Sequence, residues 1–338
     1  MKKSHNDKAT RSIRPTLISA ILLFGVVTNS PADGDNPSFD THTLSYADSV
    51  VAVHIDDGSM GVEPDHVIRW VRRAADAMVA YFGRYPVERV DVLVQASPGG
   101  RLGSGKAFFG RRIVINVGPD TRPADLDEDW RMTHEMVHLS FPDLDRRHIW
   151  MTEGVATYIE PIARARVGQM PAENVWWWMV SGLPKGMPEE GDQGLDHTHT
   201  WGRIYWGGAL YFFLADMMIR EQTDNRRSID DALRGILDAG GNGSAHWPVT
   251  RVIATGDQAT GTTVMTDLYN DMAGASVTPD IQTWFENLGV HVRGEQITFN
   301  DNAPLAHLRR AVTDPAQEIA AKAAPTLPRS GKPVNPEM

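Results

Sequence analysis

The sequence predicts an α+β fold in which an N-terminal lobe of mixed sheet and helix precedes a mostly helical C-terminal lobe, with a cleft between the two. Residues 43–55 and 87–95 alternate apolar and polar side chains, which is the period of a half-buried strand. Residues 64–82 repeat apolar side chains at helical spacing and predict an amphipathic helix between these strands. Beyond residue 130 the periodicity is mostly helical, which gives the second lobe its character.

The C-terminal lobe is predicted from helical periodicity and from the turn residues that interrupt it. The expected helices cover residues 204–222, 228–239, 263–273 and 278–287, and a hairpin or strand follows at 290–299. No internal repeat is visible, so these elements are expected to pack around one core.

Residues 1–30 read as a secretory signal peptide, because basic residues precede an apolar run of eleven residues and then small residues. Eleven apolar residues are too few to span a bilayer. Residues 31–42 are expected to be a flexible segment, residues 43–312 one folded domain, and residues 313–338 a frayed or disordered tail. The expected location is therefore secreted or periplasmic, with anchoring by an uncleaved leader as the alternative.

The charge of the chain restricts its partners. The sequence has 33 basic and 43 acidic residues, and without the leader 28 basic residues face 42 acidic ones, a formal charge of −14. Such a surface is a poor partner for nucleic acid or anionic lipid, so no nucleic acid and no stable membrane association are expected unless the leader is retained. The chain has no cysteine, so no disulfide framework or lipid-bearing cysteine is possible.

The strongest chemical signal is the pentapeptide His-Glu-Met-Val-His at residues 134–138. On a helix His134 and His138 share a face and can offer two ring nitrogens to one metal ion, while Glu135 leans toward the same site as a base. The flanking residues are apolar, as a helix in the wall of an active site requires, and Pro142 follows as a stop signal. The motif predicts a Zn²⁺ site that activates water.

A third ligand is expected from a second, antiparallel helix that begins near Trp150. Glu153 lies in its first turn, in the string Trp-Met-Thr-Glu-Gly-Val-Ala at 150–156. His148 is the alternative third ligand. Glu160, two turns after Glu153, is expected either to accept a hydrogen bond from a ligand histidine or to pair with Arg164 four residues on.

These two motifs together resemble those of the gluzincin metallopeptidases, in particular the alanyl and glycyl aminopeptidase families. The resemblance implies a zincin-like catalytic domain in which His134, His138 and Glu153 bind zinc and Glu135 is the general base. The segment that begins Tyr-Trp-Gly-Gly at residue 205 is similar to the helix pair downstream of the metal site in the glycyl aminopeptidases. The resemblance implies that the Tyr205 hydroxyl hydrogen-bonds the tetrahedral intermediate.

The chain also departs from that family pattern. Fourteen residues separate His138 from Glu153, fewer than the alanyl aminopeptidase pattern has, and residues 91–124 contain no glutamate to bind a free substrate amine. Exopeptidase activity is therefore unsupported. The β-rich run at 108–117 is expected to be either an edge strand to which an extended peptide could add or an ordinary sheet strand.

Residues 171–200 are punctuated by Gly and Pro and are predicted to form a loop. The Trp-Trp-Trp run at 176–178 either lines a substrate cleft or packs in the core. His197 and His199 in the same loop are expected to face substrate or solvent. Tyr211 is a second candidate for the role of Tyr205.

The function expected from these observations is a secreted or periplasmic zinc metallopeptidase acting on a peptide or protein substrate. Two alternatives remain: a zinc-dependent hydrolase of a non-peptide substrate, and a non-catalytic zinc-binding scaffold. The intact Glu135 favours an enzyme, because binding alone has no use for a base beside the metal.

Overall fold

The structure is a computed structural model, and it describes residues 39–108, 110–294 and 296–314. The predicted leader, most of the predicted flexible segment and nearly all of the predicted tail lie outside the described residues. The first strand begins at Phe39, earlier than the predicted domain start at residue 43.

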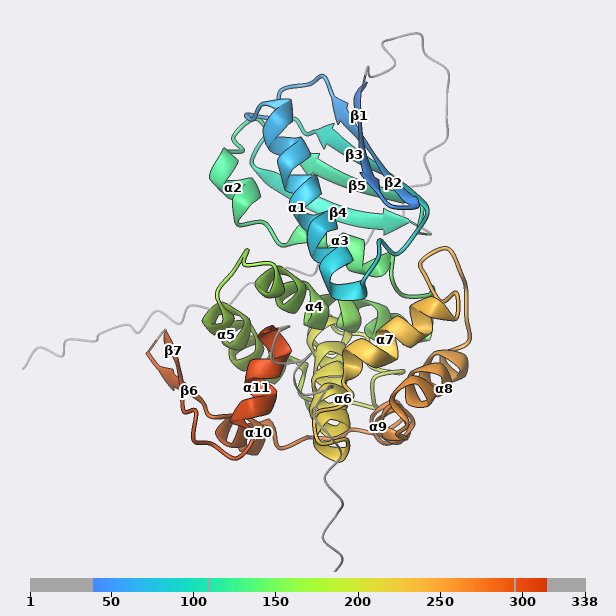
Figure 1. Ribbon diagram of the computed structural model, residues 1–338, viewed down its shortest axis with the longest axis vertical. Coiled ribbons are helices and arrows are strands. Elements are labelled where there is room, and N and C mark those ends of the chain that lie inside the picture. Colours follow the sequence, from blue (N-terminus) through green and yellow to red (C-terminus); the bar gives the residue numbers. More distant parts are fainter. Residues whose placement is uncertain (1–38, 109, 295, 315–338) are drawn as a thin grey trace, which may run out of the picture. The chain divides into compact units, whose positions relative to one another are not determined.

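The N-terminal lobe is built on a five-stranded mixed sheet (Figure 1). Its strands are β1 (Phe39–Tyr46), β2 (Ser49–Asp56), β3 (Arg89–Ala96), β4 (Leu102–Phe108) and β5 (Arg112–Val117), in the order β1-β2-β3-β5-β4. The central pairs β2–β3 and β3–β5 are parallel, and each end strand pairs antiparallel with its neighbour. The buried side chains of β3 and β5 alternate along each strand, so one face of the sheet carries the apolar core.

One prediction about strands is wrong in detail, and a second is decided between its two alternatives. Residues 43–55 are not one strand but hold the end of β1 and nearly all of β2, because the chain turns at Ala47, whose φ is 46°, and the two strands form a hairpin. For the run at 108–117 the alternative of an ordinary sheet strand is confirmed, since β5 lies inside the sheet between β3 and β4. The edge strand next to β5 is β4, which the sequence pattern does not reveal.

Helices cover the sheet and then form the second lobe. The predicted helix at 64–82 is confirmed as α1 (Pro64–Phe82), which connects the parallel strands β2 and β3. A short α2 (Pro123–Asp127) leads into α3 (Arg131–His138), and a turn connects α3 to α4 (Ile149–Arg166). Helix α4 is buried on almost every side, which makes it the central helix of the molecule.

The rest of the described chain is mostly helical. It forms α5 (Ala172–Gly182), a π-helical turn (Gly202–Gly207), α6 (Gly208–Gln222), α7 (Ile229–Asp238), α8 (Val249–Thr260), α9 (Val264–Met272), α10 (Ile281–Leu288), β6 (Val290–Arg293), β7 (Gln296–Phe299) and α11 (Ala306–Thr313). The helices predicted around α6, α7, α9 and α10 and the hairpin of β6 and β7 are confirmed. The loop predicted at 171–200 is wrong over its first part, which is α5, and the sequence pattern does not predict α8 and α11.

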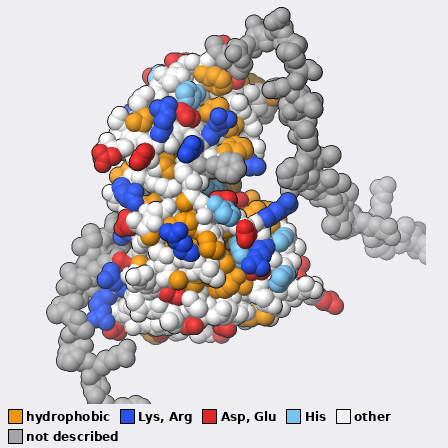
Figure 2. Space-filling view, turned by 90° about the vertical axis from the view of Figure 1, so that its right-hand side faces the viewer, with side chains coloured by type: hydrophobic (Ala, Val, Ile, Leu, Met, Phe, Trp, Pro, Cys, Tyr) orange, Lys and Arg blue, Asp and Glu red, His pale blue; other side chains and the backbone are white. Residues whose placement is uncertain are grey.

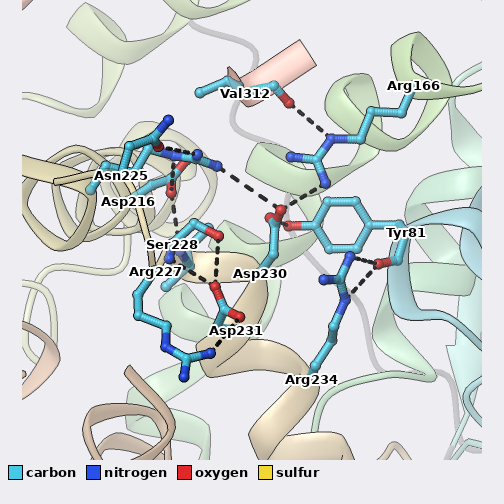
Figure 3. A network of polar contacts seen from close by, with 12 residues as sticks. Tyr81, Arg166, Asp216, Asn225, Arg227, Ser228, Asp230, Asp231, Arg234 and Val312 are labelled. Carbon is cyan, nitrogen blue, oxygen red and sulfur yellow. Dashed lines mark hydrogen bonds and ion pairs between the residues drawn. The ribbon is translucent and has the colours of Figure 1, made fainter. Parts of the chain in front are cut away.

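A buried polar network ties several of these helices together (Figure 3). Asp230 of α7 accepts hydrogen bonds from the Tyr81 hydroxyl of α1 and, at 2.7 Å, from Arg166 of α4. Asp216 of α6 accepts from the Tyr158 hydroxyl of α4 at 2.9 Å and pairs with Arg220 at 2.8 Å. Because each charge is paired where water is excluded, the network fixes α1, α4, α6 and α7 in one arrangement.

The surface has a mixed character on the face shown in Figure 2, where acidic and basic side chains are interspersed among hydrophobic ones. Within the part of the chain that the structure describes, no helix is both long enough and apolar enough to cross a membrane.

Candidate metal centre

The helix that carries the His-Glu-Met-Val-His motif is fixed at its first turn by Asp129. The Asp129 carboxylate accepts the backbone N–H of Met132 at 3.1 Å and the indole N–H of Trp70, on α1, at 3.2 Å. A carboxylate at a helix N-terminus satisfies free N–H groups and faces the positive end of the helix dipole. The acidic stretch before the motif therefore positions α3 against α1.

The second helix of the site approaches α6 at a contact between two glycines, Gly154 of α4 and Gly208 of α6. A Cβ atom added to either glycine would lie closer than 3.0 Å to backbone atoms of the other helix. Only glycine permits this approach without movement of the backbone. The close approach of α4 to α6 fixes the position of Gly154. It therefore also fixes Glu153, the residue before Gly154, beside α3.

Three potential ligand atoms converge between α3 and α4. The Nε2 atoms of His134 and His138 lie 3.3 Å and 3.5 Å from Oε2 of Glu153. All three ligand atoms lie within 4.8 Å of one another. Among residues 39–314, leaving aside 109 and 295, this is the one group of three or more histidine and acidic side chains placed to share a metal ion.

The electrostatics of this group favour a cation. For His138, burial lowers the pKa, but the carboxylates of Glu153 and Glu135 outweigh that effect and raise it overall. For Glu153, burial raises the pKa, but His138 and His134 together hold it well below its usual value. The carboxylate is therefore ionised at neutral pH, and the two imidazoles face a negative charge that a metal ion would share.

The donor set fits zinc. Two imidazole nitrogens and one carboxylate oxygen are a common three-ligand set for catalytic zinc, which leaves a fourth position for water or substrate. His134 and Glu135 are buried, with 5% and 9% exposure, so a cation held between these helices would lie in a largely dry site. The chemistry of these donors is the observation that supports a zinc site.

The Glu135 carboxylate is directed toward the edge of the sheet. Its Oε2 accepts the backbone N–H of Ala107, on β4, at 2.7 Å. A Cβ atom added to Gly105 would lie 3.0 Å from Cγ of Glu135, so the strand packs closely against this side chain. The edge strand and the expected catalytic base are thus in direct contact.

Tyr205 lies beside His134, in the π-helical turn before α6. Its ring is stacked on that of His134, with 6.3 Å between the centroids. Burial, with smaller contributions from the charges of Glu153 and Glu135, raises the pKa of Tyr205 to about 12. The hydroxyl therefore remains protonated at neutral pH and can act as a hydrogen-bond donor.

His148, the alternative third ligand, is engaged with other partners. His148 is buried, its Nδ1 lies 2.8 Å from Asp196, and its Nε2 accepts a hydrogen bond from Arg147 at 2.9 Å. Both ring nitrogens are engaged, so His148 is not positioned to bind the metal. Tyr211, the alternative to Tyr205, donates its hydroxyl to the carbonyl of Met265 at 2.7 Å.

The remaining candidates are placed as follows. Glu160 pairs with Arg164 at 2.9 Å, as the salt-bridge interpretation predicts. His197 and His199 are both exposed. Of the three consecutive tryptophans, Trp176 is buried in the core, Trp177 is exposed, and Trp178 lines a pocket beside His134.

The sequence predicts that pocket only in part, through the alternative that the tryptophan run at 176–178 lines a substrate cleft. The pocket has a volume of about 270 Å³, and His134 and Tyr205 form part of its wall. Its other walls come from α4, α5 and the residues around Trp201 and Trp206, which are far apart in the sequence. The tryptophans flanking Tyr205 are a second sequence signal for it.

The sequence matches no family model, and no curated protein matches it. The structure is similar to the crystal structure of an aminopeptidase N family protein from Idiomarina loihiensis, with a TM-score of 0.59 and 13% identity. The match covers 76% of this chain and 50% of that protein, so the chain spans about half the length of this relative. An M1 zinc metallopeptidase from Deinococcus radiodurans aligns with a TM-score of 0.47 and 16% identity over 71% of this chain and 53% of its own.

The chain therefore has the α+β, zincin-like fold of the aminopeptidase N group, as its motifs predict. At this level of identity the likeness shows the fold. The ligand group of His134, His138 and Glu153 is found in the structure independently of it.

Proposed function

We propose that this chain is a zinc-dependent metallopeptidase that hydrolyses peptide bonds. The observation that carries the proposal is the convergence of His134, His138 and Glu153, with Glu135 next to His134 on the same helix and the Tyr205 ring stacked on His134. A site built only to hold a metal needs neither a base nor a protonated donor beside it.

The residues have distinct roles in this proposal. A zinc ion held by the two histidines and Glu153 would polarise a substrate carbonyl and make a bound water more acidic. Glu135 accepts the proton of the attacking water and passes it to the departing amine nitrogen. The Tyr205 hydroxyl donates a hydrogen bond to the carbonyl oxygen as that atom gains negative charge.

A peptide substrate is supported by the position of β4. An extended chain can add to the edge of a sheet through main-chain hydrogen bonds, and β4 is the edge strand beside the expected base. A peptide lying along this edge would pass Glu135. The absence of glutamate from residues 91–124 gives no support for a requirement for a free amino terminus.

The test uses quenched peptides of mixed sequence, assayed before and after treatment with a chelator and again after zinc is restored. We expect chelator-sensitive cleavage, and we expect Glu135→Gln to retain zinc while the rate falls about a thousandfold or more. Glu173→Gln, a change at an acid on α5 away from the ligand group, serves as the matched control and should keep full activity.

Two other results would point elsewhere. Retained zinc without cleavage of any peptide, in the wild-type protein, would favour the scaffold or a hydrolase of a non-peptide substrate. Near wild-type turnover in Glu135→Gln would remove the assigned base from the mechanism.

We further propose that the chain is exported and that residues 1–30 direct this export. Basic residues followed by a short apolar run motivate the proposal. N-terminal sequencing of the protein recovered from its native compartment tests it, since an intact leader would indicate retention as an anchor.

A further inference from the structure

The pocket beside His134 has an unusual wall. Aromatic side chains supply much of it, from the start of α3, from α5 and from the π-helical turn: Trp130, Trp178, Trp201, Tyr205 and Trp206. At about 270 Å³ the pocket is large enough for the side chain of a large residue.

The rings form a continuous surface that leads away from the metal-binding group. Trp130 lies against His134, with 5.4 Å between ring centroids, and against Trp178, with 6.4 Å. Trp178 in turn contacts Trp206 at 5.1 Å. A side chain bound in this pocket would therefore lie next to His134, one of the proposed metal ligands.

Two of these tryptophan rings are more exposed to water than is usual for tryptophan in a folded protein. Trp201 is 61% exposed and Trp130 is 37% exposed, whereas tryptophan is highly buried on average. Large aromatic side chains left in contact with water beside a pocket are typical of a surface that binds an apolar group.

The charges around the pocket disfavour a basic occupant. The ammonium of Lys185 already lies over the Trp206 ring at 5.5 Å, and the guanidinium of Arg131 lies over Trp130 at 5.2 Å. The acid in the wall, Glu160, is paired with Arg164 at 2.9 Å. A cationic side chain would meet two like charges, and the carboxylate in the wall already has a partner.

We propose that this pocket is a specificity site that takes an aromatic or other large apolar side chain of the substrate residue next to the scissile bond. The proposal rests on the proposed peptidase function, and it adds the class of residue that the enzyme selects. Rings stack on the tryptophan walls, and burial of the apolar surface provides the discrimination.

The first experiment compares matched quenched peptides in which the residue on either side of the cleaved bond is Phe, Leu, Ala, Lys or Glu. We expect kcat/KM for Phe to exceed that for Ala by about ten- to a hundredfold at one of the two positions. Equal rates for Phe and Ala at both positions, or a preference for Lys, would overturn the proposal.

The variants place the preference in the pocket. Ser181→Phe fills it from α5, so the ratio of the Phe rate to the Ala rate should fall about tenfold or more. Trp201→Ala, at an exposed position that folding tolerates, should lower the same ratio severalfold. Trp177→Ala is the control, because Trp177 is on the same helix but does not line the pocket, and its ratio should stay unchanged. A ratio that Ser181→Phe and Trp201→Ala leave unchanged would contradict the proposal.

A binding measurement separates this proposal from the peptidase function. N-acetyl-phenylalanine amide and N-acetyl-alanine amide are titrated against zinc-loaded Glu135→Gln protein while tryptophan emission is followed. We expect a saturable change with the phenylalanine amide only, and its loss in the additional variant Ser181→Phe. If the phenylalanine amide binds but the wild-type protein cleaves none of the quenched peptides, the peptidase function fails while the pocket stands. If neither amide binds, the proposed pocket fails.

Discussion

The proposed role of Tyr205 depends on the position of its ring beside His134. Its ring stacks on His134, and burial keeps its hydroxyl protonated. Tyr205→Phe should lower kcat roughly ten- to a thousandfold with little change in KM, because the donated hydrogen bond forms mainly in the transition state. Steady-state kinetics with zinc content measured in parallel check this, and unchanged kcat would defeat the assignment.

Tyr211→Phe is the matched comparison, since it also removes one hydroxyl. Tyr211 donates to the carbonyl of Met265 in the core. Its loss should cost about 1–2 kcal/mol of the free energy of unfolding and leave kcat unchanged.

Gly154 determines how closely the ligand-bearing helix approaches α6. The methyl group of Gly154→Ala would lie within 3.0 Å of Gly208 backbone atoms, so α4 must move and carry Glu153 with it. We expect zinc affinity to fall by about tenfold or more and stability to fall by about 1–3 kcal/mol. A competition titration with a chelator of known affinity measures the first effect, and thermal unfolding measures the second.

Gly274→Ala provides the control for that substitution. A Cβ atom there meets no atom within 4 Å, so the same chemical change should alter neither zinc affinity nor stability appreciably. If Gly154→Ala behaved like Gly274→Ala, the close helix contact would not be what positions the ligand.

At the scale of elements, the first turn of α4 is fixed by a side chain from the loop before the π-helical turn. The Asp196 carboxylate accepts from the Trp150 indole at 2.8 Å and from the Tyr269 hydroxyl at 2.9 Å, and it pairs with His148. Three groups from two helices and a turn thus share one buried acid. The acid holds the start of the helix on which Glu153 lies.

Replacing Asp196 tests this anchoring in two grades. Asp196→Leu leaves buried donors without an acceptor and should cost about 3 kcal/mol of the free energy of unfolding and weaken zinc binding. Asp196→Asn keeps an acceptor oxygen and should cost about 1 kcal/mol. Denaturant melts and zinc content after dialysis measure both, and equal effects of the two changes would show that hydrogen bonding is not the cause.

Most elements could be predicted where the side-chain period was strong. Helix α1 buries a set of apolar residues at helical spacing, and the buried valines of β3 alternate along the strand. The helical and the strand period are therefore both visible in the sequence. The metal ligands could be predicted because His134 and His138 are one helical turn apart, and Glu153 follows in a recognisable string.

The elements that escaped prediction have a physical reason in common. Strand β4 contains Gly103 and Gly105, which weaken a strand signal, although a side chain at Gly105 would press against Glu135. Helix α5 follows Pro171 and ends at Gly182, in a segment that Gly and Pro residues punctuate, yet packing of its apolar side chains holds it helical. In each case contacts distant in sequence outweighed local propensity.

At the scale of the molecule, the site is made by the meeting of segments that local patterns cannot bring together. The expected base faces the sheet edge, the ligands lie on α3 and α4, and Tyr205 precedes α6. The specificity pocket adds residues from α5. Sequence patterns predict α3, α4 and α6, but only the packing of the central helix α4 against α3 and α6 shows that these side chains share one site.

A metal ion bridging α3 and α4 should therefore stabilise the whole domain. Binding to the folded state alone contributes about 4 kcal/mol when free zinc is roughly a thousandfold above its dissociation constant, which for a domain of this size corresponds to a rise in Tm on the order of 10 °C. Scanning calorimetry with zinc, and after chelation, measures the shift. Glu153→Ala removes a ligand and should abolish it, whereas Glu135→Gln leaves all three ligands in place and should preserve it. A zinc-dependent Tm that persisted in Glu153→Ala would show that the stabilising ion is bound somewhere other than between these two helices.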